Sequence, residues 1–276
     1  MNPKANHNIN IEFTGGINEQ TDLVGFIDES GDEGFDFTKD GVTDWFNVSA
    51  LICRPAVARI MVNYIRNYIF KSKLTRPLHK MTFKQLRHET RRDLSAGLNQ
   101  YKFLTTHSIF FKRKIDLKNN LVRYPSMYFV GIKNVIERMT WCASQYNCSR
   151  IHIIISNRNA IRVTDLQTYL FVNSVNAKKN LWYKDRLGIV KLANFNQRPQ
   201  LLLADYAAYT LRAALEKNGD PLVIQPWYFD LFQKGKLYSS NHKKWKGIWG
   251  CGIKCTPDDK SLIQHSGILD EGSHQV

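Results

Sequence analysis

Residues 21–32 read TDLVGFIDESGD and place acidic side chains directly after an apolar segment. The run 23–27 has the composition of a short buried strand, and Asp28, Glu29 and Asp32 follow it. Carboxylates at the rim of a core are unfavourable unless they are paired, hydrogen-bonded or bound to a metal ion. The stretch therefore predicts a divalent-cation site. Its Ser- and Gly-containing end is also typical of a hairpin turn, in which exposed acids need no function.

The composition indicates a folded, basic protein. The chain has 276 residues, of which 43% are hydrophobic and 12% aromatic, enough for one main domain with a sizeable core. Lys and Arg number 39 against 24 Asp and Glu, so the formal net charge is +15. A charge of this sign favours a polyanionic partner, and we expect nucleic acid.

The sequence contains no apolar run long enough to cross a membrane, and its polar start lacks a signal-peptide core. We therefore expect a cytoplasmic protein with no membrane partner. The five cysteines are odd in number and widely scattered, and none forms a CxxC pair. This pattern predicts reduced thiols and favours neither a disulfide framework nor a zinc site.

The apolar patterns predict an α/β chain with a mixed sheet flanked by helices. Strands at 44–53 and 101–111 are expected to follow the first strand in antiparallel fashion, whereas the isoleucine-rich run 151–155 is typical of a strand in a parallel sheet. Later segments alternate between helix and strand, as in parallel crossovers. One helix is predicted to begin near residue 56. Further helices are predicted over 82–98, 124–146, 163–177 and 199–217, and a short strand is expected at 188–192.

Composition also predicts the domain organisation. Residues 1–20 are expected to form a flexible arm, and 21–217 the α/β domain. An aromatic and basic extension at 218–255 is expected to pack on that domain. The polar segment 256–276 is predicted to be disordered.

A second acidic residue, Asp205, lies inside the almost entirely apolar segment 199–217. Helical spacing places leucine, alanine and tyrosine side chains around it, so its carboxylate is expected on a packed face. Two interpretations follow: Asp205 is neutralised by Arg212, or it is held for a metal ion or for proton transfer.

Three segments resemble the domain-of-unknown-function 3800 family, whose motif is DESG. They are FIDESGD at 26–32, His79-Lys80, and LLADYAAYTLR at 202–212. The resemblance covers roughly residues 21–217. It implies a ribonuclease H-like fold, in which carboxylates of the first strand, a middle strand and the last helix bind Mg²⁺ or Mn²⁺ for phosphodiester cleavage. It also suggests, by analogy, a setting in bacterial or phage conflict systems.

Carried onto this sequence, the resemblance makes Asp28 the central metal ligand and Asp205 the ligand from the closing helix, with Glu29 or Asp32 as an auxiliary acid. The middle strand departs from the family pattern, because IIISNRN has Ser156 and Asn157 where the family has an aspartate. Asn157 is then the candidate third ligand through its amide oxygen. A neutral ligand at this position implies one of two things. Either the metal site has fewer negative charges and holds one ion in place of two, or the protein binds its partner and has lost cleavage.

The sequence thus predicts a metal-dependent nuclease acting on RNA or DNA, with Glu29 or His79 moving protons. The alternative is a catalytically impaired ribonuclease H-like protein that binds nucleic acid or a protein partner; homo-oligomerisation stays open. A third interpretation makes the acids purely structural. The residues expected to contact nucleic acid are Lys80, Lys112, Arg113, Lys114, Arg158, Lys243, Lys244 and Trp245.

Overall fold

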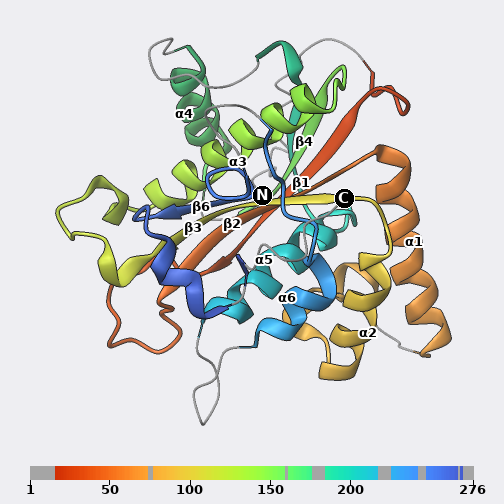
Figure 1. Cartoon of the computed structure of the whole chain (residues 1–276), viewed down its shortest axis with the longest axis horizontal. Helices are drawn as coiled ribbons and strands as arrows, with labels where there is room; N and C mark the ends of the chain where they lie inside the picture. Colours follow the sequence, from red (N-terminus) through yellow and green to blue (C-terminus); the bar gives the residue numbers. More distant parts are fainter. Residues whose placement is uncertain are drawn as a thin grey trace, which may run out of the picture.

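A six-stranded sheet in the order β5-β4-β1-β2-β3-β6 carries the acidic stretch at its centre (Figure 1). The computed structural model describes residues 16–73, 77–158, 161–175, 184–216, 225–241, 247–266 and 268–269. β2 is antiparallel to both of its neighbours, β1 and β3, whereas β4 is parallel to β1, β5 to β4, and β6 to β3. This mixed sheet confirms the predicted fold class. The strands are β1 Leu23–Gly31, β2 Trp45–Cys53, β3 Leu104–Phe111, β4 Ile151–Ser156, β5 Leu187–Ala193 and β6 Ile253–Thr256.

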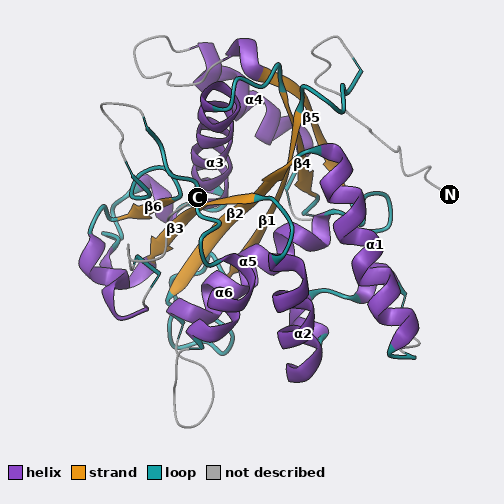
Figure 2. Cartoon of the chain, turned by 45° about the vertical axis from the view of Figure 1, so that its right-hand side comes forward, coloured by secondary structure: helices purple, strands orange, loops and turns teal. Residues whose placement is uncertain are grey.

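Helices cover both faces of the sheet (Figure 2). α3 and α4 pack on one face through a core that includes Ile132 and Leu166, and α1, α2, α5 and α6 pack on the other. No helix within the described ranges is long and apolar enough to span a membrane. The helices are α1 Pro55–Lys71, α2 His88–Asn99, α3 Ser126–Gln145, α4 Val163–Val175, α5 Leu201–Leu215 and α6 Pro226–Gln233.

The alternation of side chains along β1 decides which acid faces which layer. Val24 and Phe26 belong to the core beneath α5, whereas Leu23 and Ile27 belong to the core beneath α3. Because side chains alternate along a strand, the residue after Ile27 points toward α5 and the next one toward α3. β1 thus directs its two adjacent carboxylates to opposite faces of the sheet.

β1 is longer than the apolar run suggested. Asp28 pairs with Ser49 of β2, and the strand continues to Gly31, so the acids lie within the strand and not beyond it. Gly31 has φ +100, and a Cβ atom there would lie 2.3 Å from the carbonyl oxygen of Trp45. Only glycine fits this position without strain, and it lets the chain turn toward β2.

The helix expected over 82–98 begins later, at the start of α2. The preceding segment forms two short 3-10 helices, η1 Leu78–Lys80 and η2 Phe83–Gln85, because the backbone N–H of Phe83 is directed to a side chain of α5. The local apolar pattern of the sequence cannot reveal this contact, because the contact is made with a distant part of the chain.

The C-terminal region is part of the same fold. β6 extends the sheet beside β3, and a 3-10 helix, η6 Lys260–Ser266, follows where disorder was predicted. Ile263 and Ile268 are buried against Leu211 and Leu215 of α5. Two short apolar pairs, Leu262-Ile263 and Ile268-Leu269, are a weak local signal in a polar segment, which is why composition predicted disorder. Residues 270–276, like 1–15 of the predicted arm, lie outside the described ranges.

The cysteine prediction is confirmed. All five thiols are buried and free. Burial raises the pKa of Cys53 to about 12, so this thiol stays protonated at neutral pH.

Candidate acidic site

The fold brings Asp28 of β1 together with Asp205 of α5. Asp28 is only 7% exposed, and its pKa is raised well above the ordinary value by burial and by the nearby charges of Glu29 and Asp205. The pKa of Asp205 is raised to about 7, mainly because the carboxylate is removed from water, with the charge of Glu29 adding to the effect. α5 packs directly on β1, and the charge of Asp205 raises the pKa of Asp28, so the first strand and this helix place the two carboxyl groups in one acidic region.

Asp205 is held by the backbone of η2 and not by Arg212. Its Oδ2 accepts a 2.6 Å hydrogen bond from the Phe83 N–H, and the Phe83 carbonyl accepts a 2.9 Å bond from Nε of Arg91. The Arg212 guanidinium lies over the Tyr209 ring at 5.1 Å. No ion pair among the described side chains joins Arg212 to Asp205, so the structure does not support the structural interpretation of this acid.

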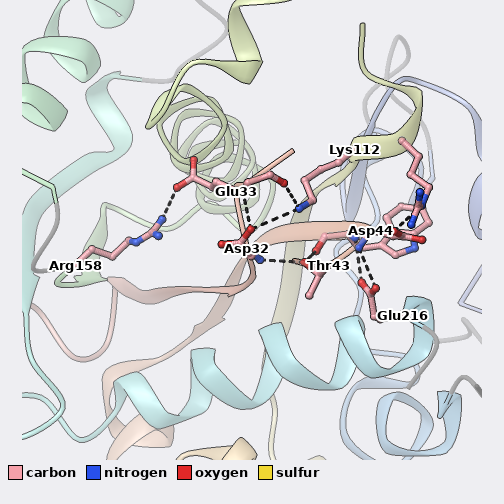
Figure 3. Close-up of polar contacts among 10 residues, drawn as sticks. Asp32, Glu33, Thr43, Asp44, Lys112, Arg158 and Glu216 are labelled. Carbon is pink, nitrogen blue, oxygen red and sulfur yellow. Dashed lines mark hydrogen bonds and ion pairs between the residues drawn. The ribbon is translucent and has the colours of Figure 1, made fainter. Parts of the chain in front are cut away.

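The C-terminal end of α5 is also tied to the sheet. Glu216 accepts hydrogen bonds from the backbone N–H groups of Asp44 and Trp45, at 2.9 and 3.0 Å, where β2 begins (Figure 3). The helix that carries Asp205 is therefore bonded to other segments at Asp205 itself and at its C-terminal end.

The middle strand contributes a hydroxyl group. β4 runs parallel to β1 with Ile155 opposite Ile27, so Ser156 comes next to Asp28, and its side chain hydrogen-bonds the carboxylate. Within the described residues it is Ser156, and not the predicted Asn157, that contacts Asp28. Asn157 lies just after the strand, where its backbone N–H donates to the Ala193 carbonyl at 3.0 Å. A neutral oxygen thus stands where the family pattern has a carboxylate.

Glu29 faces the α3 side and meets Arg158. The charge of Glu29 raises the pKa of Asp28, its neighbour in β1. Nε of Arg158 lies 3.2 Å from Glu29 Oε1. Nη1 of Arg158 lies 2.7 Å from Glu33 Oε2 (Figure 3). Burial raises the pKa of Glu29, and the Arg158 charge partly opposes this. Arg158, predicted to contact nucleic acid, therefore serves as a counter-ion inside the acidic site.

Glu33 and Tyr128 were not predicted as site residues. The Tyr128 backbone N–H donates to Glu33 Oε1 at 3.0 Å, and the Arg158 guanidinium lies over the Tyr128 ring at 5.0 Å. Glu33 follows the DESGD motif by one residue, where the sequence resembles an exposed turn. Its burial depends on α3, which is far away in the sequence, so no local signal reveals it.

Lys112 is a structural residue. Its side chain is 0% exposed, and Nζ donates a 2.6 Å hydrogen bond to the Gly34 carbonyl, with Asp32 Oδ1 at 3.8 Å (Figure 3). Lys112 was predicted to contact nucleic acid, and the structure places its side chain under the loop after β1. Asp32, expected as an auxiliary acid, accepts the Gly34 N–H at 2.7 Å and so helps to shape the same loop.

The neighbouring basic residues remain at the surface, each with about half of its side chain exposed. Nε of Arg113 lies 2.6 Å from Asp44 Oδ1, and Nζ of Lys114 lies 3.6 Å from Asp259 Oδ2. Both already have acidic partners, so a contact with nucleic acid there would compete with an existing ion pair.

Lys112→Met is expected to lower the free energy of unfolding by about 1–3 kcal/mol, because it leaves the partly buried Gly34 carbonyl without its donor. Lys114→Met, two residues away and half exposed, should change it by less than about 0.5 kcal/mol. Urea denaturation of the two variants measures the difference. Equal losses would contradict the structural role of Lys112.

Other predicted residues are not joined to the site by any described contact. His79 is half-buried in η1 and Lys80 is exposed beside it. No hydrogen bond or ion pair within the described part of the chain links His79 to Asp28 or Asp205, so its role in proton transfer stays a prediction. Lys243, Lys244 and Trp245 lie outside the described residues.

The donor set suits a single hard cation. In the part of the chain that the structure describes, no three His, Cys, Asp or Glu side chains are grouped so as to hold a metal ion. The site offers the carboxylates of Asp28 and Asp205 with the hydroxyl of Ser156, while Glu29 is engaged by Arg158. Oxygen donors of this kind suit Mg²⁺ or Mn²⁺. These are two carboxylates and one hydroxyl, without the third carboxylate that a two-ion site would use.

No family model matches this chain, no curated protein is significantly similar to it, and no solved structure matches it. The geometry of the acidic site and the topology of the sheet therefore carry the functional argument.

Proposed function

We propose that this chain is a divalent-metal-dependent nuclease that hydrolyses phosphodiester bonds in RNA or DNA. The observation that supports this most directly is that Asp28 and Asp205, which are far apart in the sequence, lie in one acidic region. Among the described residues, no cationic side chain forms an ion pair with either of them. Bringing such carboxylates together is unfavourable unless a cation compensates for their charge. The family resemblance implies the same chemistry at the same two residues.

Each residue of the acidic site would have a separate role in the reaction. Asp28 and Asp205 hold one Mg²⁺ or Mn²⁺, and Ser156 supplies a neutral oxygen beside them. A bound ion of this kind polarises a phosphoryl oxygen and lowers the pKa of a bound water. Glu29, the residue after Asp28 in β1, is the proposed proton acceptor. The bond from Phe83 keeps Asp205 in position throughout.

A basic segment beside Asp205 is the proposed contact for the nucleic-acid backbone. The Phe83 N–H bond joins η2 to the site, and Lys80, Lys84 and Arg87 are exposed on either side of Phe83. Exposed cations next to a metal site attract phosphates and hold a strand against it. This assignment replaces the surface role first predicted for Lys112.

The double variant Lys80→Ala/Lys84→Ala is expected to weaken binding of a single-stranded oligonucleotide and to reduce the slope of log K against log[salt] by about 1.5. Fluorescence anisotropy over a range of salt concentrations measures both. The matched control is Lys254→Ala/Lys260→Ala, which removes the same charge from β6 and η6, at the opposite edge of the sheet from β5. If both pairs reduce the slope equally, the segment beside Asp205 has no special role.

The hydroxyl of Ser156 favours a second candidate function, a catalytically impaired protein that binds nucleic acid or a protein partner. A neutral group at this position lowers the charge available to a metal ion. Under this alternative, salt-sensitive binding is unaffected by EDTA and by Asp28→Asn, and no cleavage appears with Mn²⁺. Cleavage that requires Mg²⁺ or Mn²⁺ and disappears in Asp28→Asn supports the nuclease.

A further inference from the structure

Trp227 is an exposed aromatic residue whose ring is fixed by its neighbours. It is the second residue of α6 and is 36% exposed. Its ring stacks on Tyr228, with centroids 4.3 Å apart and an interplanar angle of 20°. The ring of His88, the first residue of α2, lies 4.6 Å from Trp227 and 5.8 Å from Tyr228. Tyr228 and His88 therefore pack against neighbouring sides of Trp227, and no other ring among the described residues contacts it.

The two rings that support Trp227 are held in place in turn. The Tyr228 hydroxyl oxygen lies 2.7 Å from Nδ1 of His88, which is a hydrogen-bond distance, and Tyr228 is buried. α6 packs against both α2 and α5 (Figure 2). An exposed tryptophan by itself needs no explanation. A ring that is already fixed loses little conformational freedom when a ligand binds, so this one is suited to contact a second flat group.

A series of direct contacts connects Trp227 to the acidic site. Tyr228 meets Phe83 edge-on, with ring centroids 5.3 Å apart. The N–H of Phe83 donates the 2.6 Å hydrogen bond to Asp205. Trp227 is thus two ring contacts away from the residue that holds Asp205. We therefore expect its ring to be within reach of a nucleotide close to a phosphate bound at the acidic site.

The segment that joins the acidic site to His88 is basic. Residues 80–92 contain five Lys and Arg against one acid, Glu89. Lys84 and Arg87 are exposed in this segment, as is His88. Proteins that bind single-stranded nucleic acid combine cations that contact the phosphates with aromatic rings on which the bases stack. The positive charge therefore favours nucleic acid over a protein partner at this surface.

We propose that Trp227 and His88 form a stacking surface for an unpaired base, so that the nucleic acid bound at the acidic site is single-stranded. Within a duplex, each base lies between its neighbours and its faces are not available to a protein ring. This specificity rests on the proposed nuclease function and names the substrate class of that site. Trp227 and His88 position the strand and do not contact the scissile group.

Binding of fluorescent oligonucleotides in EDTA, measured by anisotropy, tests the proposal without any need for cleavage. The probes are oligothymidylate and oligouridylate, each about 12 nucleotides long and each also used as a duplex with its complement. Trp227→Ala is expected to weaken single-strand binding by about 5- to 150-fold, because one stacked base is lost, and to change duplex binding by less than about twofold. Trp227→Phe keeps an aromatic face and should retain most of the affinity.

The matched control is Tyr146→Ala, which removes an aromatic side chain from a residue that is 51% exposed just after α3, on the other face of the sheet. Its single-strand binding should equal that of the wild-type protein. Circular dichroism first checks that Trp227→Ala folds. A second measurement needs no variant: iodouracil in the single strand crosslinks to a stacked aromatic ring on irradiation. Mass spectrometry of wild-type peptides is expected to place the crosslink on Trp227 or His88, and it alone decides if Trp227→Ala does not fold.

The outcomes separate the stacking surface from the nuclease function. A loss in Trp227→Ala that is confined to single strands, with a crosslink at Trp227 or His88, supports the surface. An equal loss for duplexes, no loss for single strands, or a crosslink elsewhere overturns it and leaves metal-dependent cleavage standing. If the wild-type protein binds neither single strand, the surface is also overturned, and a protein partner becomes the alternative occupant. Single-strand binding that depends on Trp227, without cleavage in Mg²⁺ or Mn²⁺, supports the surface and removes the proposed nuclease function.

Discussion

Asp205→Asn is expected to reduce Mg²⁺- or Mn²⁺-dependent cleavage more than about 100-fold while making the metal-free protein more stable. The pKa of Asp205 rises from its ordinary 3.8 to about 7 in the folded chain, so the ionised carboxylate opposes folding. At pH 8 we expect the variant to gain about 2–4 kcal/mol in the free energy of unfolding. A substitution that lowers activity and raises stability indicates that the original residue serves function at a cost in stability.

The sign of the pH effect follows from the direction of the shift. An acid whose pKa is raised on folding contributes nothing below its unfolded value, and it lowers stability as the pH rises from about 4 to about 7. The stability gain of Asp205→Asn should therefore be larger at pH 8 than at pH 5. Urea denaturation in EDTA at both pH values measures it.

Asp230→Asn is the control for that measurement. Asp230 is an exposed acid of α6, the helix that packs against α5, and its replacement should change neither stability nor cleavage. Undiminished cleavage by Asp205→Asn, or a stability change that is the same at pH 5 and pH 8, would remove Asp205 from the site.

Mn²⁺ is expected to raise the melting temperature of the wild-type protein at pH 8 and to have a much smaller effect at pH 6. An ion at 100 times its dissociation constant adds about 2.7 kcal/mol to the stability of a folded protein. Below about pH 7 a proton occupies Asp205 and competes with the ion, so the apparent affinity should fall about tenfold per pH unit for each proton displaced. Thermal unfolding with increasing Mn²⁺ at the two pH values tests this.

Asp28→Asn provides the contrast, because it removes the central ligand. The melting temperature of this variant should not respond to Mn²⁺ at either pH. An equal rise in Asp28→Asn, or an equal rise of the wild-type protein at both pH values, would place any bound Mn²⁺ elsewhere on the molecule.

The order of strands and helices could be predicted because the apolar patterns are local. The isoleucine run of β4 and the alternation of β1 follow from burial on one or both faces of a sheet, and the structure has both strands where the pattern places them. Boundaries were less predictable. The start of α2 depends on a bond between Phe83 and Asp205, residues that no sequence window contains together.

The site was predictable only where a single residue conflicts with its local surroundings. Asp28 and Asp205 could be found because each is a carboxylate in an apolar segment. Glu33 and Lys112 could not be assigned, since a turn and a basic run look the same whether or not another part of the chain covers them. Lys112 is buried because the Gly34 carbonyl needs a donor there, and only the folded loop shows it.

The two attachments of α5 have a consequence for ligand binding. Phe83 bonds Asp205 itself, and Glu216 bonds the first residues of β2, so the helix cannot slide or tilt without breaking hydrogen bonds at one end or the other. The position of Asp205 is therefore preorganised, because it is fixed as the chain folds. An incoming cation would meet this carboxylate already in place, and its binding would not have to compensate for lost backbone entropy.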